Sequence, residues 1–392
     1  MNKRNNSLVV FLLLVSCGYK IFGVITTSDM TMLLVAGFTV CKNNFEVSRK
    51  LLWFLIFFTL IMPTLSLGVN ATNEIEFLKS LLQLFLYVFS AGMVMSYYLK
   101  RLELSEIETA YVKFGLVSSL LVLVQWYVYF FYDINIFSYI STWGGKSSWI
   151  ENYIRIAGLT LHYNQLAIIL CPPFVMSLEK KKVAVSVIIF IALLCSGSRI
   201  GLACALFSVY IYLLKHGKVT LFLTLSIIGF MAISYLATTD IFIKRFSFLI
   251  SGELDGSTLQ RFDLWRAALE LYREHWVFGV GPGQYRDILK VDNVESGVID
   301  ILLNYGVVGV LCFIFIIIRS IPVGFRDELF GFKFSMLLVF IQNMVQPFLF
   351  MSIIGSLFWL LFMTIFLHKN EGKSSQSKSK ICQICSGTEL NA

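Results

Sequence analysis

The feature that most constrains this chain is a series of apolar blocks that are long enough, or nearly long enough, to cross a lipid bilayer. A transmembrane helix needs about 20 predominantly apolar residues. Charged residues make up only 14% of the chain, whereas soluble domains average about 25%. The sequence therefore predicts an all-α polytopic membrane protein with about 12 transmembrane helices. The blocks lie near residues 8–25, 29–41, 51–69, 77–98, 114–132, 159–177, 183–197, 199–214, 219–237, 297–318, 333–346 and 348–367.

The basic residues follow the order of these blocks. If the N-terminus is cytoplasmic and the helices alternate in direction, every cytoplasmic segment carries at least two Lys or Arg residues. Membrane proteins concentrate these residues in cytoplasmic loops. The pattern predicts a multi-spanning protein of an inner or plasma membrane with both termini in the cytoplasm. Because topology accounts for the net charge of +8, nucleic acid is not expected as a partner.

The alternation also divides the chain into regions. Residues 1–237 are expected to hold nine transmembrane helices, with an outer loop near 133–158. A large extracytoplasmic loop follows at 238–296, and three more helices follow at 297–367. Residues 368–392 are polar and rich in Ser and Lys, which predicts a disordered cytoplasmic tail. Several basic residues in the two outer loops oppose the orienting rule, so another use for them is expected.

Arg199 is the only charged residue in the apolar stretch 188–214. A guanidinium group in the hydrocarbon of a bilayer is costly. The stretch is therefore interpreted as two short helices that meet at Ser196-Gly197-Ser198, with this turn at the outer face. Arg199 then lies at the outer surface of the membrane, in contact with water.

The large loop contains a predicted amphipathic helix followed by a glycine-rich turn. Large apolar residues recur every three or four positions from residue 262 to residue 276, so one aromatic face could lie along the membrane surface. They are Phe262, Trp265, Leu269, Tyr272 and Trp276. The glycines that follow, Gly279 and Gly281, let backbone N–H groups approach an anion. A turn of this composition is more often a simple chain reversal.

Six arginines map to the outer side of the predicted membrane. Each one alone could be solvated, or could pair with a carboxylate or a lipid phosphate. As a set they suit a diphosphate, because a guanidinium group grips phosphate oxygens through two hydrogen bonds at once. The sequence shows no tight group of Asp, Glu and His, so neither a metal nor a cofactor is expected. The arginines are Arg155, Arg199, Arg261, Arg266, Arg273 and Arg286.

The order of four short motifs resembles the O-antigen polymerase and O-antigen ligase superfamily of polytopic glycosyltransferases, over about residues 150–320. Ligases in this family usually carry a His-Asn pair eleven residues before the glycine equivalent to Gly306. Here Glu295 and Ser296 occupy those positions, which favours a polymerase. The motifs are Arg155-Ile-Ala-Gly158 with His162-Tyr-Asn164, Ser196-Gly-Ser-Arg199-Ile-Gly201, Arg261-Phe-Asp-Leu-Trp265 with Phe278-Gly-Val-Gly281, and Asn304-Tyr-Gly306 with Gly309.

The resemblance implies an enzyme that joins undecaprenyl-diphosphate-linked oligosaccharide repeat units into O-antigen or capsular polysaccharide. The implied partners are the lipid-linked donor and acceptor, the bilayer, a chain-length regulator and a flippase. Arg199 and Arg261 would stabilise the departing diphosphate. Glu295 is the first candidate for the base, because it replaces the family's histidine, and His162 and His275 come next. The expected substrate-binding residues are Arg155, Arg266, Arg273, His162, Asn164, Gly279, Gly281 and Arg286.

Three alternatives stay open at this point. A ligase that transfers glycan to lipid A-core is the closer one, because the motifs are shared. A lipid-linked glycan flippase would also have about twelve spans, but it would be expected to show internal repeats and charges along a central path. The third alternative concerns His162, which could form a hydrogen bond at the end of a helix and have no role in substrate binding.

Overall fold

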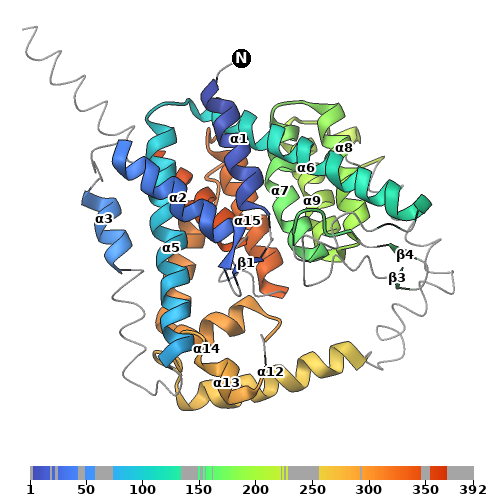
Figure 1. Ribbon diagram of the computed structural model, residues 1–392. Coiled ribbons are helices and arrows are strands. Elements are labelled where there is room, and N and C mark those ends of the chain that lie inside the picture. Colours follow the sequence, from blue (N-terminus) through green and yellow to red (C-terminus); the bar gives the residue numbers. More distant parts are fainter. Residues whose placement is uncertain are drawn as a thin grey trace, which may run out of the picture.

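The computed structural model describes most of the chain and is helical apart from two short antiparallel hairpins (Figure 1). This confirms the predicted all-α membrane protein. Arg155, much of the predicted loops near 133–158 and 238–296, and the tail from residue 369 lie outside the described residues. The structure describes residues 3–17, 20–22, 25–42, 49–57, 74–132, 134, 149–150, 153–154, 156–160, 162–221, 223–224, 227, 256–291, 294–345 and 354–368.

The elements follow one another along the chain in three groups. The first group is α1 (Lys3–Val15), β1 (Lys20–Phe22), β2 (Ile25–Thr26), α2 (Thr27–Lys42), α3 (Arg49–Ile56), α5 (Glu74–Leu99) and α6 (Leu104–Tyr132). The second is β3 (Trp149–Ile150), β4 (Tyr153–Ile154), α7 (Tyr163–Glu179), α8 (Val183–Ser196) and α9 (Arg199–Lys215). The third is α12 (Gly256–Glu274), α13 (Gln284–Leu289), α14 (Gly297–Ser320), α15 (Phe330–Val345) and a helix over Ile354–His368.

Three of the described helices are long and apolar enough to cross a membrane: Phe77–Leu99, Leu104–Tyr132 and Gly297–Ser320. Shorter apolar helices accompany them. The prediction of one span over residues 8–25 is wrong, because α1 ends at Val15 and the chain then forms the β1–β2 hairpin. The total of twelve stays a prediction. The shorter apolar helices are Asn6–Val15, Thr27–Cys41, Val183–Ser196, Phe330–Met344 and Ile354–His368.

Helix α7 occupies the centre of the bundle, where it packs against α6, α8, α9 and α15. Every residue from Gln165 to Ser177 is buried, including Pro172 and Pro173 within the helix. Proline removes a backbone donor from a helix, and surrounding helices allow this inside a membrane. Close packing is visible at Gly115 of α6, where an added Cβ atom would lie 2.3 Å from the Cβ of Pro173.

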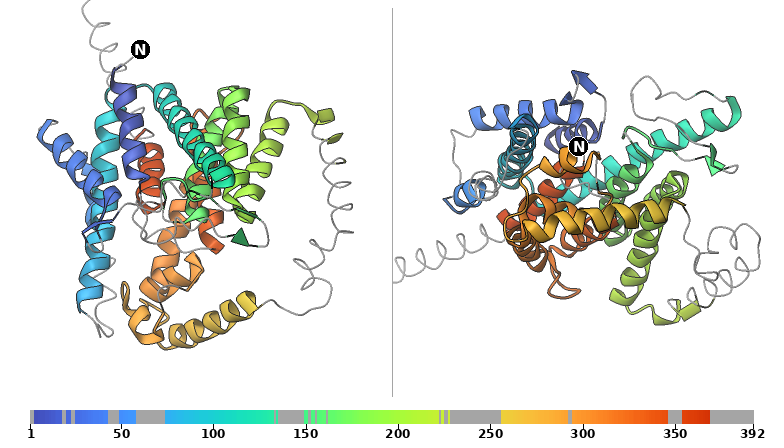
Figure 2. Two further views of the ribbon diagram at one scale, coloured as in Figure 1. Left: turned by 45° about the vertical axis from the view of Figure 1, so that its right-hand side comes forward. Right: turned by 90° about the horizontal axis from the view of Figure 1, so that it is seen from below.

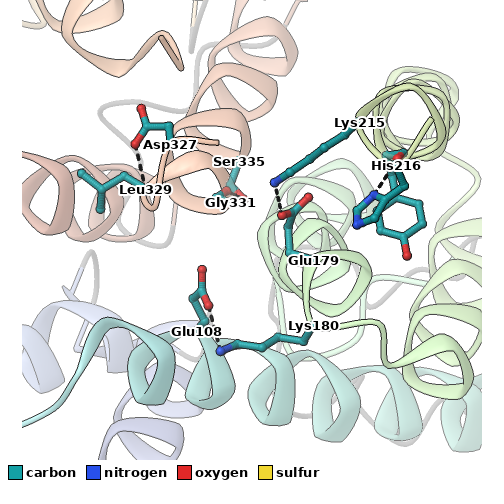
Figure 3. Close-up of polar contacts among 10 residues, drawn as sticks. Glu108, Glu179, Lys180, Lys215, His216, Asp327, Leu329, Gly331 and Ser335 are labelled. Carbon is teal, nitrogen blue, oxygen red and sulfur yellow. Dashed lines mark hydrogen bonds and ion pairs between the residues drawn. The ribbon is translucent and has the colours of Figure 1, made fainter. Parts of the chain in front are cut away.

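Ion pairs join the helix ends at one end of the bundle (Figure 3). Glu108 of α6 accepts from Lys180 at 3.0 Å, and Glu179 of α7 pairs with Lys215 at the end of α9. Near the start of α15, Lys333 pairs with Asp327. These lysines belong to segments that the charge pattern assigns to the same side of the membrane. The side that this end faces stays a prediction.

The pair between Asp327 and Lys333 is the most buried of these contacts, with 13% and 5% of the side chains exposed. Burial acts to raise the pKa of Asp327, but Lys333 and the backbone N–H of Leu329 outweigh it and hold the pKa below the usual 3.8. A carboxyl with a depressed folded pKa stabilises the fold above its unfolded pKa. That contribution is lost as the pH falls through the folded pKa.

We therefore expect Asp327→Asn to lower the free energy of unfolding by about 2 kcal/mol at neutral pH, because it leaves a buried lysine without its counter-ion. The measurement is the thermal unfolding midpoint in detergent, with Arg326→Gln at an exposed neighbouring position as the matched control. The difference between wild type and Asp327→Asn should shrink below about pH 4. Equal midpoints for the two variants at pH 7 would contradict the assignment.

Candidate functional site

The candidate site lies at the other end of the bundle from the ion pairs. Helix α15 connects the two ends: its first turns carry Lys333, and Asn343 in its last turn contacts Gly297 at the start of α14. Figures 1 and 2 show α12 running across this end of the bundle, away from the N-terminus. Helix α8 also ends on the side opposite the ion pairs, where Cys195 O accepts a hydrogen bond from Ile156 N at 3.0 Å.

The glycine-rich turn after α12 is interlocked with a break in α14. At Gly306 the backbone leaves helical geometry, with φ 62° and ψ −157°. The carbonyl oxygen of Leu303 accepts from Val280 N at 2.7 Å, and Val307 N donates to Trp276 O at 2.9 Å. Backbone groups freed by a broken helix at membrane depth need such partners inside the protein. The two glycine motifs seen separately in the sequence are therefore one structural unit.

Both glycines of this unit are needed for close approach of two backbones. A Cβ atom at Gly279 would lie 2.4 Å from Leu303 O, and one at Gly306 would lie 2.3 Å from Val277 O. The N–H groups of the turn already donate inside the protein: Gly279 N to His275 O at 2.8 Å, and Gly283 N to an Asn304 side-chain oxygen at 2.8 Å. The structure thus gives Gly279 a packing role, and substrate binding by Gly279 and Gly281 stays a prediction.

A buried carboxylate, Asp300, lies directly beneath this unit and was missed by the sequence reasoning. Its side chain accepts from the hydroxyl of Tyr285 at 2.5 Å, and its backbone oxygen accepts from Asn304 Nδ2 at 2.8 Å. Burial, followed by the neighbouring Asp300 carboxylate, raises the pKa of Tyr285 well above its usual value. Arg286 follows in α13, with its guanidinium carbon 5.9 Å from the centre of the Tyr285 ring. Asp300 is the single acidic residue of the apolar block 297–318, which could have identified it.

Two of the three predicted catalytic residues are in direct contact. Arg261 of α12 donates through Nε to Glu295, in the turn before α14. One turn further along α12, the indole N–H of Trp265 donates to Val294 O at 2.8 Å. Glu295 has a φ of +48°, a conformation that residues other than glycine rarely adopt. This turn therefore fastens α12 to the start of α14 and brings a guanidinium and a carboxylate together.

The apolar residues of α12 differ in how far the protein itself covers them, and the contact of their shared face with the membrane surface stays a prediction. Trp265 is hydrogen-bonded to Val294 and Tyr272 packs against the small core of α13 and α14, whereas Phe262, Leu269 and Trp276 are 48%, 43% and 57% exposed. Because α12 packs against α13 and α14 on one side, the remaining apolar side chains are left exposed.

Arg266 and Arg273 are exposed, and neither forms an ion pair within the described part of the chain. Their assignment to the substrate stays a prediction.

Arg199 is the first residue of α9, as expected from the division of the apolar stretch into two helices. Gly197 ends α8 with a left-handed φ of 64°, and the Ser198 hydroxyl oxygen accepts from Gly201 N at 3.3 Å to begin α9. The Arg199 side chain is exposed. Among the described contacts, no hydrogen bond or ion pair links Arg199 to Arg261 or Glu295.

The second predicted motif ends in a helix cap. His162 precedes α7, and its Nδ1 accepts from Asn164 N at 3.2 Å. This is the structural alternative considered for His162, and it also engages the backbone of Asn164. Substrate binding by either residue stays a prediction. No group of three His, Cys, Asp or Glu residues that could hold a metal ion occurs in the described ranges.

Part of the chain that forms this region is similar to a known protein family. Residues 184–314, which run from α8 into α14, match a family described as O-antigen ligase. The match includes Arg199, Arg261, Glu295 and the interlocked glycines. No curated protein and no solved structure matches the chain.

We expect Gly279→Ala and Gly306→Ala each to lower the free energy of unfolding by about 3 kcal/mol, because each adds a clash with backbone to a strained positive φ. The thermal unfolding midpoint in detergent measures this. Gly324→Ala is the matched control, since no atom lies within 4 Å of the added Cβ. Midpoints of all three variants close to that of wild type would show that the two segments are not interlocked.

Proposed function

Residues 184–314 place this protein in the O-antigen ligase and polymerase superfamily, and from that premise we propose that it is a polysaccharide polymerase of the cytoplasmic membrane. The donor is an oligosaccharide on undecaprenyl diphosphate. Its glycan is transferred to the terminal sugar of a second lipid-linked repeat unit at the outer membrane face. Both chain termini lie in the cytoplasm in this proposal.

The chemical requirement of this reaction is stabilisation of negative charge. As the anomeric C–O bond breaks, charge develops on the departing lipid diphosphate, and preorganised cations oppose the cost of this charge. Arg261 supplies a guanidinium group held by the anchored helix α12. Arg199 supplies another at the N-terminus of α9, where the helix dipole also favours an anion. Arg155, Arg266, Arg273 and Arg286 are additional candidates for binding phosphate or sugar.

The observation that carries the proposal is the contact between Arg261 and Glu295. It unites a cation suited to phosphate with the carboxylate that stands where ligases of the family usually carry histidine. This substitution favours a polymerase. The second candidate function is O-antigen ligase, because the matching family is described by that activity.

Arg199→Ala and Arg261→Ala should each reduce polymer formation by at least about 100-fold, because each removes a cation from the developing charge. Lysine at either position should restore little activity, since its ammonium group does not grip phosphate bidentately. Polymer length is measured in cells by gel electrophoresis, with membrane insertion checked by immunoblot. Arg326→Ala, at an exposed residue near the opposite end of the bundle, is the matched control. Normal-length polymer from both Arg199→Ala and Arg261→Ala would contradict the diphosphate role.

A deletion strain separates polymerase from ligase. Loss of a polymerase should leave single repeat units on the surface acceptor, because chain extension stops before transfer. Loss of a ligase should instead leave long chains on the lipid carrier. The two products differ in length and in the group at the reducing end, and mass spectrometry of surface glycan and extracted lipid measures both. Long carrier-bound chains in the deletion strain would overturn the polymerase assignment in favour of the ligase.

A further inference from the structure

We propose that Glu295 is a positioning residue that covers Arg261 in the substrate-free protein and is displaced from it by the incoming diphosphate. This inference rests on the proposed function, because it requires Arg261 to be a diphosphate-binding cation. It gives Glu295 a role different from that of a general base. The pair would act as a latch, closed without substrate and open with it.

The exposure of the pair suits an exchange of partners. Arg261 and Glu295 have 34% and 45% of their side chains exposed. An ion pair in contact with water contributes little to stability, so opening it costs little. A diphosphate offers several charged oxygens to the same guanidinium group and can bind it bidentately. The incoming anion can therefore compete successfully with a single carboxylate.

The net charge of the pair determines how strongly Arg261 attracts an anion while Glu295 is bound to it. Arg261 and Glu295 together are neutral, so an approaching anion gains little from Arg261 until Glu295 withdraws. The nearby basic residues do not change this balance, since Arg266 and Arg273 are exposed on another face of α12. In the closed state the site therefore discriminates against weakly charged anions, which displace a carboxylate poorly.

The backbone around Glu295 is fixed on both sides, so the side chain alone can move. Val294 O accepts from the Trp265 indole, and Ser296 begins α14 while its hydroxyl donates to Met344 O at 3.1 Å. The left-handed φ of Glu295 is thus imposed by anchored neighbours. When Glu295 swings away, these contacts keep Arg261 and α12 in place for the diphosphate. The anchoring is what makes the latch reversible without refolding of the turn.

The ion pair also argues against a base role in the closed state. The Glu295 oxygen that accepts the guanidinium N–H is already occupied. Neutralising Glu295 without changing its shape separates the two roles. A latch predicts that Glu295→Gln, which removes the negative charge that faces Arg261, tightens anion binding, whereas a base predicts loss of turnover with unchanged anion affinity.

The test uses the full-length protein in phosphatidylcholine nanodiscs, whose surface has no net charge, and inorganic pyrophosphate as the probe in calorimetry. Glu295→Gln should bind pyrophosphate about fivefold more tightly than wild type. The double variant Arg261→Ala/Glu295→Gln should lose this gain. Glu270→Gln, an exposed carboxylate on another face of α12, is the matched control and should leave the affinity unchanged. Unfolding midpoints are recorded for each variant.

Each remaining outcome has a defined meaning. If Arg261→Ala weakens binding but Glu295→Gln does not strengthen it, the latch is wrong and the proposed function stands. Loss of polymerisation by Glu295→Gln at unchanged pyrophosphate affinity likewise overturns the latch and assigns the residue to proton transfer. If Arg261→Ala leaves the affinity unchanged in both backgrounds, Arg261 does not bind diphosphate, and both the latch and the role of Arg261 in the proposed function fall.

Discussion

The arrangement of the candidate site depends on the interlocking of two backbones. A helix that breaks inside a membrane exposes N–H and C=O groups that water cannot reach, so another part of the chain must bond them. Here the break at Gly306 is filled by residues 276–280, through the bonds from Val280 N to Leu303 O and from Val307 N to Trp276 O. This fixes the end of α12 against α14. The fixed end and the anchored turn at Val294 together determine where Arg261 is presented.

The sequence was sufficient for features that depend on local chemistry. The cost of a buried arginine predicted the turn between α8 and α9, and the three- to four-residue periodicity predicted α12. Features that depend on distant contacts were not accessible in this way. The periodicity of α12 does not reveal that only one side meets α13 and α14. Likewise, the two glycine motifs are separated by more than twenty residues, and nothing in either indicates that they bond each other.

The same limit applies to individual roles within the site. Arg261 and Glu295 were each identified from the sequence, but their ion pair depends on the path of the chain between α12 and α14. Asp300 was not predicted, because the expected ligand is an anion and a carboxylate does not favour the binding of an anion. A carboxylate in an apolar block is as costly as an arginine, and its partner Tyr285 lies in a segment without a strong pattern of its own. The free-energy cost of a charged residue in an apolar segment therefore indicates a residue with a special role, whether the charge is positive or negative.

Ion pairs occur at both ends of the bundle, and their exposure to solvent determines whether they hold helices together or can exchange partners. At one end, the side chain of Lys333 is 5% exposed and that of Asp327 is 13% exposed. Separating them would leave an unpaired charge without water, so the pair is suited to holding helices together. At the other end, Arg261 and Glu295 retain a third or more of their exposure. Glu295 can therefore be replaced at Arg261 by water or by another anion at small cost. A membrane protein that must stay assembled while it exchanges a highly charged ligand needs both kinds of pair, and burial is what separates them.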